Sequence, residues 1–165
     1  MSELIKKTLT VKNYVLQGSS DLDALYSMVR CEDDQGDTVN FKKVVMLNYL
    51  KRHGAMNADA PCTWYYKHLN KKSIILIAIE KANGKVEYDI DQMRRVAKFT
   101  IVKGFVYGVL TIPAGVIIAT ATYGFGLLFI PYGLYLSYRN IFKFPRILRR
   151  QTLVHDLAAH GVVVR

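Results

Sequence analysis

The sequence predicts an α+β protein in which a small N-terminal β-rich barrel domain is followed by a transmembrane helical hairpin and a short C-terminal amphipathic helix. Residues 104–138 form a run of 35 residues without Asp, Glu, Lys, Arg or His, and this run predicts the hairpin. Alternating apolar and polar residues before the run predict the strands. We therefore divide the chain into residues 1–92, 93–144 and 145–165.

The strands of the first domain follow from period-two alternation and from turn residues between them. In the first strand, alternation places Leu9, Val11 and Val15 on one face. A partial apolar face that ends before Gly54 predicts one short helix. The predicted strands are 8–16, 26–31, 38–44, 62–69, 73–80 and 85–90, and the predicted helix is 45–53.

Two features of the sequence predict the last strands of this domain. The segment 73–79 is apolar on both faces, which predicts a central strand. Asn83-Gly84, between two strand-like segments, is typical of a β-hairpin turn.

Three strands, a short helix and two or three further strands resemble the element order of OB-like barrels, and a generic small barrel is the alternative. The OB resemblance implies oligonucleotide binding, with Tyr26, Arg30, Trp64 and Tyr65 as candidate stacking surfaces. The first 93 residues, however, carry 13 basic and 12 acidic side chains, which is a poor balance for binding phosphates. We therefore expect the aromatic side chains in the core or at an interface, and we do not expect a nucleic-acid partner.

The charge-free run is too long for one crossing. As a straight helix it would measure about 52 Å, nearly twice the hydrocarbon thickness of a bilayer. A turn at residues 120–124 divides it into two arms that extend to about Val96 and Phe142. We expect this hairpin to span the membrane, and a shallow hairpin that enters one leaflet is the alternative.

Basic residues dominate the flanks of the hairpin. Residues 94–165 carry 10 basic side chains and one acidic side chain. The positive-inside rule then predicts a multi-pass protein of the inner membrane with both termini in the cytoplasm. The side chains expected to contact anionic lipid headgroups are Arg94, Arg95, Lys98, Lys103, Arg139, Lys143, Arg146, Arg149 and Arg150.

Two prolines lie at matched depth in the two arms. Pro113 and Pro131 are each nine residues from position 122, and each removes a helical hydrogen bond. Such paired interruptions predict helix kinks, and in transporters they mark binding sites. Since no charged side chain lines the run, we expect two kinked arms that pack together.

Small residues form a ridge along the first arm. Their spacing of four, three, four and four residues places them on one helical face, where backbones can approach closely. The ridge residues are Gly104, Gly108, Thr111, Gly115 and Ala119, and the small residues of the second arm are Thr122, Gly126, Gly133 and Ser137. This ridge either packs one arm against the other or joins protomers.

Catalytic, cofactor and metal signals are weak. The sequence has no Gly-rich phosphate loop, nucleophile elbow or paired carboxylates, and His155-Asp156 with His160 lacks the spacing of zinc peptidases. We therefore predict no enzyme, no cofactor and no metal site. Cys31 and Cys62 are expected to stay reduced. Lys6-Lys7 interrupts the first apolar residues, so no signal peptide is expected at the start.

The tail predicts an interfacial segment at 139–150, a break at Pro145 and a helix at 152–160. The apolar side of this helix needs a partner, which is the first domain, the bilayer or another protein. Its residues are Leu153, Val154, Leu157 and Ala158.

The leading functional hypothesis is a membrane-anchored, non-enzymatic interaction or assembly protein that binds a protein partner or forms a homo-oligomer. The alternative is a pore-forming protein, because residues 104–138 resemble the inserting hairpin of pore-forming bacteriocins. A lipid-metabolising enzyme with its active site among the basic flanks is a third, weaker class.

Overall fold

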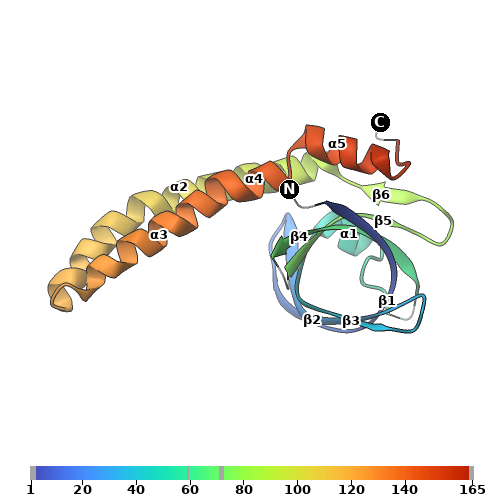
Figure 1. Cartoon of the computed structure of the whole chain (residues 1–165), viewed down its shortest axis with the longest axis horizontal. Coiled ribbons are helices and arrows are strands. Elements are labelled where there is room, and N and C mark those ends of the chain that lie inside the picture. The colour runs from blue at the N-terminus through green and yellow to red at the C-terminus, as the bar shows by residue number, and fades with distance from the viewer. Residues whose placement is uncertain (1–2, 59, 71–72, 164–165) are drawn as a thin grey trace. The chain divides into compact units, whose positions relative to one another are not determined.

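The computed structural model describes residues 3–58, 60–70 and 73–163. These residues form a mixed β-barrel of five strands, β1 to β5, and a sixth short strand, β6, pairs with β5. One long helix and several shorter helices follow (Figure 1). The strands are β1 (Leu4–Ser19), β2 (Asp23–Asp33), β3 (Thr38–Leu47), β4 (Cys62–Asn70), β5 (Ser73–Glu80) and β6 (Val86–Tyr88). The helices are α1 (Asn48–Arg52), α2 (Ile90–Ala121), the 3₁₀-helix η1 (Phe125–Leu128), α3 (Phe129–Tyr138), the π-helix η2 (Arg139–Lys143), α4 (Phe144–Ile147) and α5 (Arg150–Ala159).

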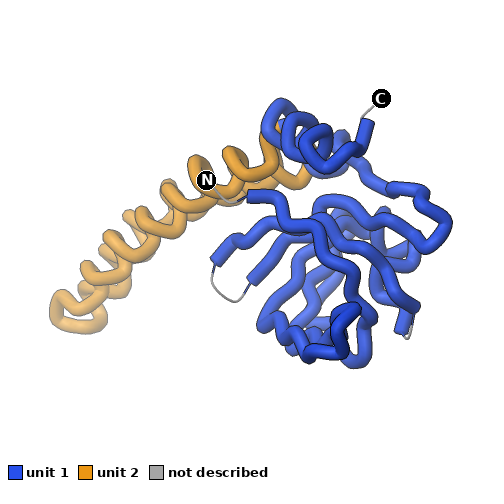
Figure 2. Tube along the Cα trace, turned by 45° about the vertical axis from the view of Figure 1, so that its right-hand side comes forward, with its two compact units in different colours: residues 1–93, 150–165 blue, residues 94–149 orange. Residues whose placement is uncertain are grey.

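The chain divides into two compact units (Figure 2). Unit 1 comprises residues 1–93 and 150–165, and unit 2 comprises residues 94–149. Unit 2 is therefore an insertion between the barrel and α5.

The barrel closes through one parallel pair of strands. β1 pairs antiparallel with β2 and with β4, and β5 pairs antiparallel with β4. β3 and β5 then close the ring in parallel, with Val44 opposite Ile74. α1 lies between β3 and β4 in the chain, and β6 pairs with β5. The predicted order of three strands, a short helix and three strands is confirmed.

β5 is the central strand of the core. Its residues from Ser73 to Ile79 are buried on both faces, as its continuous apolar sequence predicted. The turn before β6 is also confirmed, since the Gly84 amide donates to the Lys81 carbonyl at 2.8 Å. Gly84 has a φ of +75°, a conformation that favours glycine.

The predicted shared face of Leu9, Val11 and Val15 on β1 is wrong at Val15. Leu9 and Val11 are each 1% exposed, but Val15 is 47% exposed. The pairing with β2 shifts register between Val11 and Asn13 and again between Asn13 and Val15. These bulges break the alternation that the prediction assumed. β4 pairs with β1 only as far as Leu9, so the rest of β1 extends past that neighbour.

The predicted helix at 45–53 is also too long. Val45 belongs to β3, where it pairs with both Leu25 and Ile75, and α1 begins only at Asn48. Closure of the barrel at this point outweighs the local helical pattern. The predicted end is confirmed, because Gly54 follows the helix with a φ of +91°.

The predicted break at Pro145 is wrong. Helical backbone continues from α3 through η2 into α4, where Pro145 lies in the first turn and the helix ends at Ile147. A π-turn directly before the proline gives the chain the local adjustment that it needs.

α5 packs on the barrel within unit 1 and resolves the question of its partner. Leu153 and Leu157 are fully buried. The Asp156 carboxylate pairs with the Lys67 ammonium on β4. A ring nitrogen of His160 lies 3.1 Å from the Leu4 carbonyl oxygen on β1. Of the three candidate partners, the first domain covers this helix.

Candidate membrane-binding surface

Unit 2 is a helical hairpin whose arms contact each other through the small residues. A methyl group added at Gly104 would lie 2.9 Å from Asn140 Cβ, and one added at Gly108 would lie 2.8 Å from Ser137 Oγ. A methyl group at Gly133 would collide with Thr111 in the same way. The ridge therefore faces the second arm of the same chain.

Contact is closest near the turn. A methyl group at Gly115 would lie 2.5 Å from Ile130 Cγ1, and one at Gly126 would meet the backbone of Ala119. Gly124 follows the first arm with a φ of +95°, and its amide donates to the Ala119 carbonyl at 2.9 Å. The chain thus reverses within the segment 120–124, as predicted.

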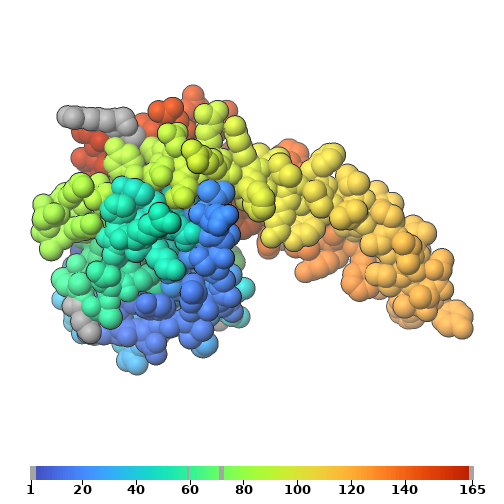
Figure 3. Space-filling view, turned by 180° about the vertical axis from the view of Figure 1, so that it is seen from behind, coloured from blue at the N-terminus to red at the C-terminus, as the bar shows by residue number. Residues whose placement is uncertain are grey.

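The outer surface of the hairpin is apolar and exposed. Side chains of α2, in yellow, stand on the surface of this unit (Figure 3). The large exposed apolar side chains of the two arms include Phe105, Val109, Leu110, Ile112, Val116, Ile117, Phe125, Leu127, Leu128, Phe129, Tyr132, Leu134, Tyr135 and Tyr138. An exposed apolar area of this extent on a soluble monomer would be unusual, and it marks an interaction surface.

α2 is long and apolar enough to cross a membrane. Its most apolar 18-residue window is only 11% buried, in contrast to the core helix of a soluble protein. It is the one such helix among residues 3–58, 60–70 and 73–163. The second arm changes helix type between 125 and 147, so none of its individual helices is long enough by itself.

The two prolines occupy different helical positions. α2 continues through Pro113, whereas Pro131 is the third residue of α3 and lies in its first turn. Both prolines thus lie within helical backbone, Pro113 inside α2 and Pro131 shortly after the change from η1 to α3.

The basic flanks lie at the open end of the hairpin. These basic side chains come from α2, η2, α4 and the start of α5. α2 contains Arg94, Arg95, Lys98 and Lys103; η2 begins at Arg139 and ends at Lys143; α4 contains Arg146; and α5 begins at Arg150, directly after Arg149. Two of the cations lie over aromatic rings: Lys103 Nζ is 5.8 Å from the Tyr107 ring centre and Arg139 Cζ is 5.7 Å from that of Phe144. Residues 94–149 contain no acidic side chain that could neutralise these charges.

Three of the four candidate stacking residues of the barrel are not available on its surface. Tyr26, Trp64 and Tyr65 are 2%, 0% and 1% exposed, and of the four candidates only Arg30 is exposed. Trp64 stacks on Phe41 inside the barrel at a ring distance of 6.3 Å. All three aromatic side chains are therefore buried, and Tyr65 lies on the outer face of β4, where its ring centre is 6.0 Å from that of His160.

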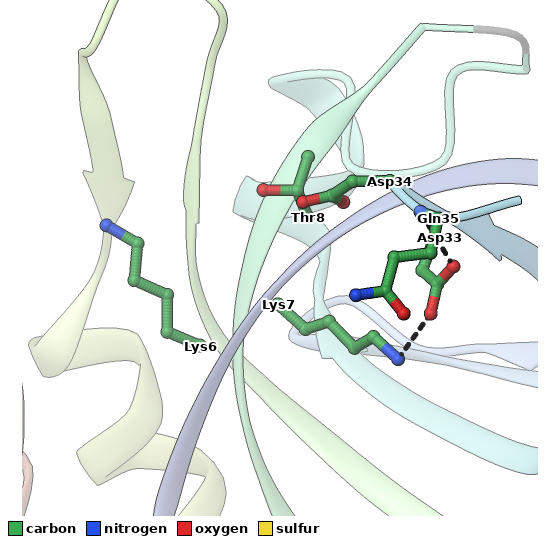
Figure 4. Close-up of a pocket in the computed structure, with 6 residues that line it drawn as sticks. All are labelled: Lys6, Lys7, Thr8, Asp33, Asp34 and Gln35. Carbon is green, nitrogen blue, oxygen red and sulfur yellow. Dashed lines mark hydrogen bonds and ion pairs between the residues drawn. The ribbon is translucent and has the colours of Figure 1, made fainter. Parts of the chain in front are cut away.

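A polar hollow of about 390 Å³ lies beside the start of β1 and the end of β2 (Figure 4). Its cations are already paired. Lys7 Nζ lies 2.8 Å from Asp33, and this ion pair holds the pKa of the Asp33 carboxyl below its usual value. Lys6 points away from the other residues drawn and pairs with Glu80 at 3.0 Å. The hollow is lined by Lys6, Lys7, Thr8, Asp33, Asp34 and Gln35.

The two cysteines are also unsuited to act as nucleophiles at neutral pH. Both are free and buried. Burial raises the pKa of the Cys31 thiol to about 12 and that of Cys62 to about 11. A nucleophilic cysteine needs the opposite shift.

The sequence patterns did not predict one important contact, the ion pair between Lys67 and Asp156. Lys67 is 1% exposed, which is rare for lysine. The available signal was that Asp156 is the only acidic residue in 94–165.

No family model matches the sequence, and no curated protein or solved structure matches the chain.

Proposed function

We propose that this chain is a non-enzymatic, membrane-anchored interaction or assembly protein. In this proposal the hairpin crosses the inner membrane and holds the barrel and α5 in the cytosol. The observation that carries the proposal is the charge-free segment 104–138, whose large apolar side chains lie exposed on the hairpin. Lipid is the solvent in which such a surface is stable.

Chain connectivity supports two crossings. Residues 93 and 150 belong to the same compact unit, so the segment between them leaves and returns on one side of any membrane. α2 provides the first crossing, and the continuous helical segment 125–147 provides the second. From Lys103 to position 122 the first arm measures about 28 Å, close to the thickness of the hydrocarbon core. This length favours a spanning hairpin over a shallow one.

The basic flanks support the orientation. Their positive charges would face the anionic headgroups of the cytoplasmic leaflet, each at a gain of about 1 kcal/mol. Both termini would then be cytoplasmic.

The barrel is the proposed partner-binding domain. We assign it to the OB-like class because β1 pairs with both β2 and β4 while β3 and β5 close the ring in parallel. The partner in this proposal is a protein, either another chain or a second copy. Nucleic acid is disfavoured, since the candidate stacking aromatics Tyr26, Trp64 and Tyr65 are buried.

The test is membrane association of the full chain with a charge placed at mid-depth. Ile112 is 52% exposed and lies near the middle of the first arm, whereas Phe99 is 64% exposed among the basic flanks. Ile112→Arg should weaken insertion by about 3 kcal/mol. Phe99→Arg, the matched control, should leave it unchanged.

Association is measured by flotation on lipid gradients and by resistance to alkaline extraction. The proposal requires the wild type and Phe99→Arg to float and resist extraction while Ile112→Arg is released. Release of the wild type, or equal retention of all three, would contradict it.

The pore alternative needs an oligomer that encloses an aqueous path. Gly108 contacts Ser137 of its own chain, so a protomer interface would have to use another face. We therefore expect Gly108→Leu to destabilise the hairpin and leave oligomer stoichiometry in membranes unaltered. Cross-linking beside the wild type measures this, and dissociation of an oligomer by Gly108→Leu, together with membrane depolarisation by the wild type, would favour the pore.

A further inference from the structure

α5 covers a buried charge on the outer face of the barrel. Tyr65 and Lys67 alternate along β4 with Trp64 and Tyr66, and the latter two pack on Phe41 inside the barrel. The outward Lys67 side chain is only 1% exposed and pairs with Asp156 of α5. A lysine in such a position requires a charged partner, because an unpaired buried ammonium is costly.

Apolar and aromatic side chains make up most of the remaining contact. Leu153 and Leu157 are 0% exposed and Val162 is 7% exposed. His160 lies over Tyr65 with ring centres 6.0 Å apart. These contacts stabilise α5 on the barrel, but apolar residues alone would pack as readily on another apolar surface.

A competing surface is close along the chain. α5 begins at Arg150, directly after Arg149, and it has leucines on one side. In the proposed anchoring, Arg149 and Arg150 would hold the start of α5 at the anionic headgroups, within reach of the bilayer. Asp156 is the only acidic side chain in 94–165, so at such a surface it alone would be repelled.

We propose that Asp156 is a specificity residue that selects the barrel over the anionic bilayer as the docking surface of α5. This inference rests on the proposed membrane anchoring. On the barrel, Asp156 neutralises Lys67; at an anionic surface, the same carboxylate is repelled. One side chain thus stabilises the wanted contact and disfavours the competing one, as specific recognition commonly requires.

The experiment is hydrogen exchange of the full chain in nanodiscs, measured peptide by peptide by mass spectrometry. One set of nanodiscs contains phosphatidylcholine only, and the other contains phosphatidylglycerol. The variants are Asp156→Asn, the swap Lys67→Asp with Asp156→Lys, and His155→Asn as matched control. His155 is the neighbour of Asp156 on the same helix, and its side chain is 86% exposed.

We expect wild-type α5 to be equally protected in both nanodiscs. Asp156→Asn should speed exchange of α5 about a hundredfold in neutral nanodiscs, because Lys67 loses its partner. In anionic nanodiscs the variant helix should regain protection and cross-link to lipid carrying a photoreactive headgroup. The swap should restore barrel docking in neutral nanodiscs, and His155→Asn should behave as wild type.

Two results would overturn the inference. One is α5 exchange in Asp156→Asn that equals wild type in neutral nanodiscs. The other is faster exchange throughout the barrel strands, which would mean that the ion pair supports folding of unit 1 and not the choice of surface. Failure of the wild type to incorporate into nanodiscs would instead contradict the proposed membrane anchoring, so the two failures are distinguishable.

Discussion

At the scale of single residues, Gly126 is the most sensitive position of the hairpin. A Cβ there would lie 2.5 Å from the Ile118 carbonyl carbon and against the Ala119 backbone, which cannot rotate away as a side chain can. We expect Gly126→Leu to cost about 1–3 kcal/mol of hairpin stability. The measurement is the loss of helical circular dichroism on titration with SDS. Ala114→Leu, on the exposed side of α2, is the control and should change little; equal effects of both would show that the arms do not pack through Gly126.

Glu87 gives the barrel a defined pH dependence. It is 5% exposed; Lys85 Nζ lies 2.9 Å from one carboxylate oxygen, and Tyr49 Oη donates to the other at 2.7 Å. These contacts, with that to Lys85 the larger, lower the pKa of the Glu87 carboxyl below its usual value. Because the folded-state pKa is the lower one, the stabilisation is present above the unfolded pKa and disappears as pH falls through the folded pKa.

Glu87→Gln should therefore cost about 1–3 kcal/mol at pH 7 and much less at strongly acidic pH. Urea unfolding of the full chain in detergent measures this, with the fluorescence of Trp64, the single tryptophan, as reporter. Glu32→Gln removes an exposed pair with Lys12 and should change stability by less than about 1 kcal/mol. A pH-independent loss in Glu87→Gln would contradict the electrostatic explanation.

At the scale of elements, the sequence predicted most of the barrel because its signals are local. A few consecutive residues are enough to predict the apolar strand β5, and the same holds for the Asn83-Gly84 turn. Val15, Val45 and Pro145 were placed wrongly because a bulge, barrel closure and a π-turn depend on neighbours distant in sequence or on backbone adjustments that have no residue signature. The small-residue ridge was visible as a pattern, but only the structure showed that it faces the second arm.

The proposed hairpin also predicts which side of the membrane its turn and unit 1 face. Ala121→Cys, at the turn, should react with a membrane-impermeant maleimide applied from outside the cell. Val163→Cys, which is 79% exposed in unit 1, should react only after the membrane is permeabilised. Cys31 and Cys62 need not be removed, because burial raises their thiol pKa values to about 12 and about 11. Labelling of both introduced cysteines only from the cytoplasmic side would mean that the hairpin does not span.

At the scale of the whole molecule, unit 1 is built from two distant stretches of chain, so we expect the first 92 residues alone to be less stable than the complete unit. That fragment lacks α5 and exposes the surface that Leu153, Leu157 and Val162 cover. Burial of each of these side chains contributes about 1.5–3 kcal/mol. A chain in which about ten Gly and Ser residues replace 94–149 should retain these contacts, since such a linker spans about 17 Å on average.

We expect the linked chain to be soluble without detergent, rich in β-structure by circular dichroism, and more than about 10 °C more stable than residues 1–92. It should not float with lipid vesicles and should not depolarise membranes, since the exposed apolar surface of unit 2 is gone. Thermal melts of the two proteins side by side provide the measurement. Equal melting temperatures would show that α5 adds little to the barrel. Aggregation of the linked chain would show that unit 1 needs the hairpin or the membrane to fold. That result would contradict the proposal that a lipid-embedded anchor is joined to an independently folding cytosolic domain.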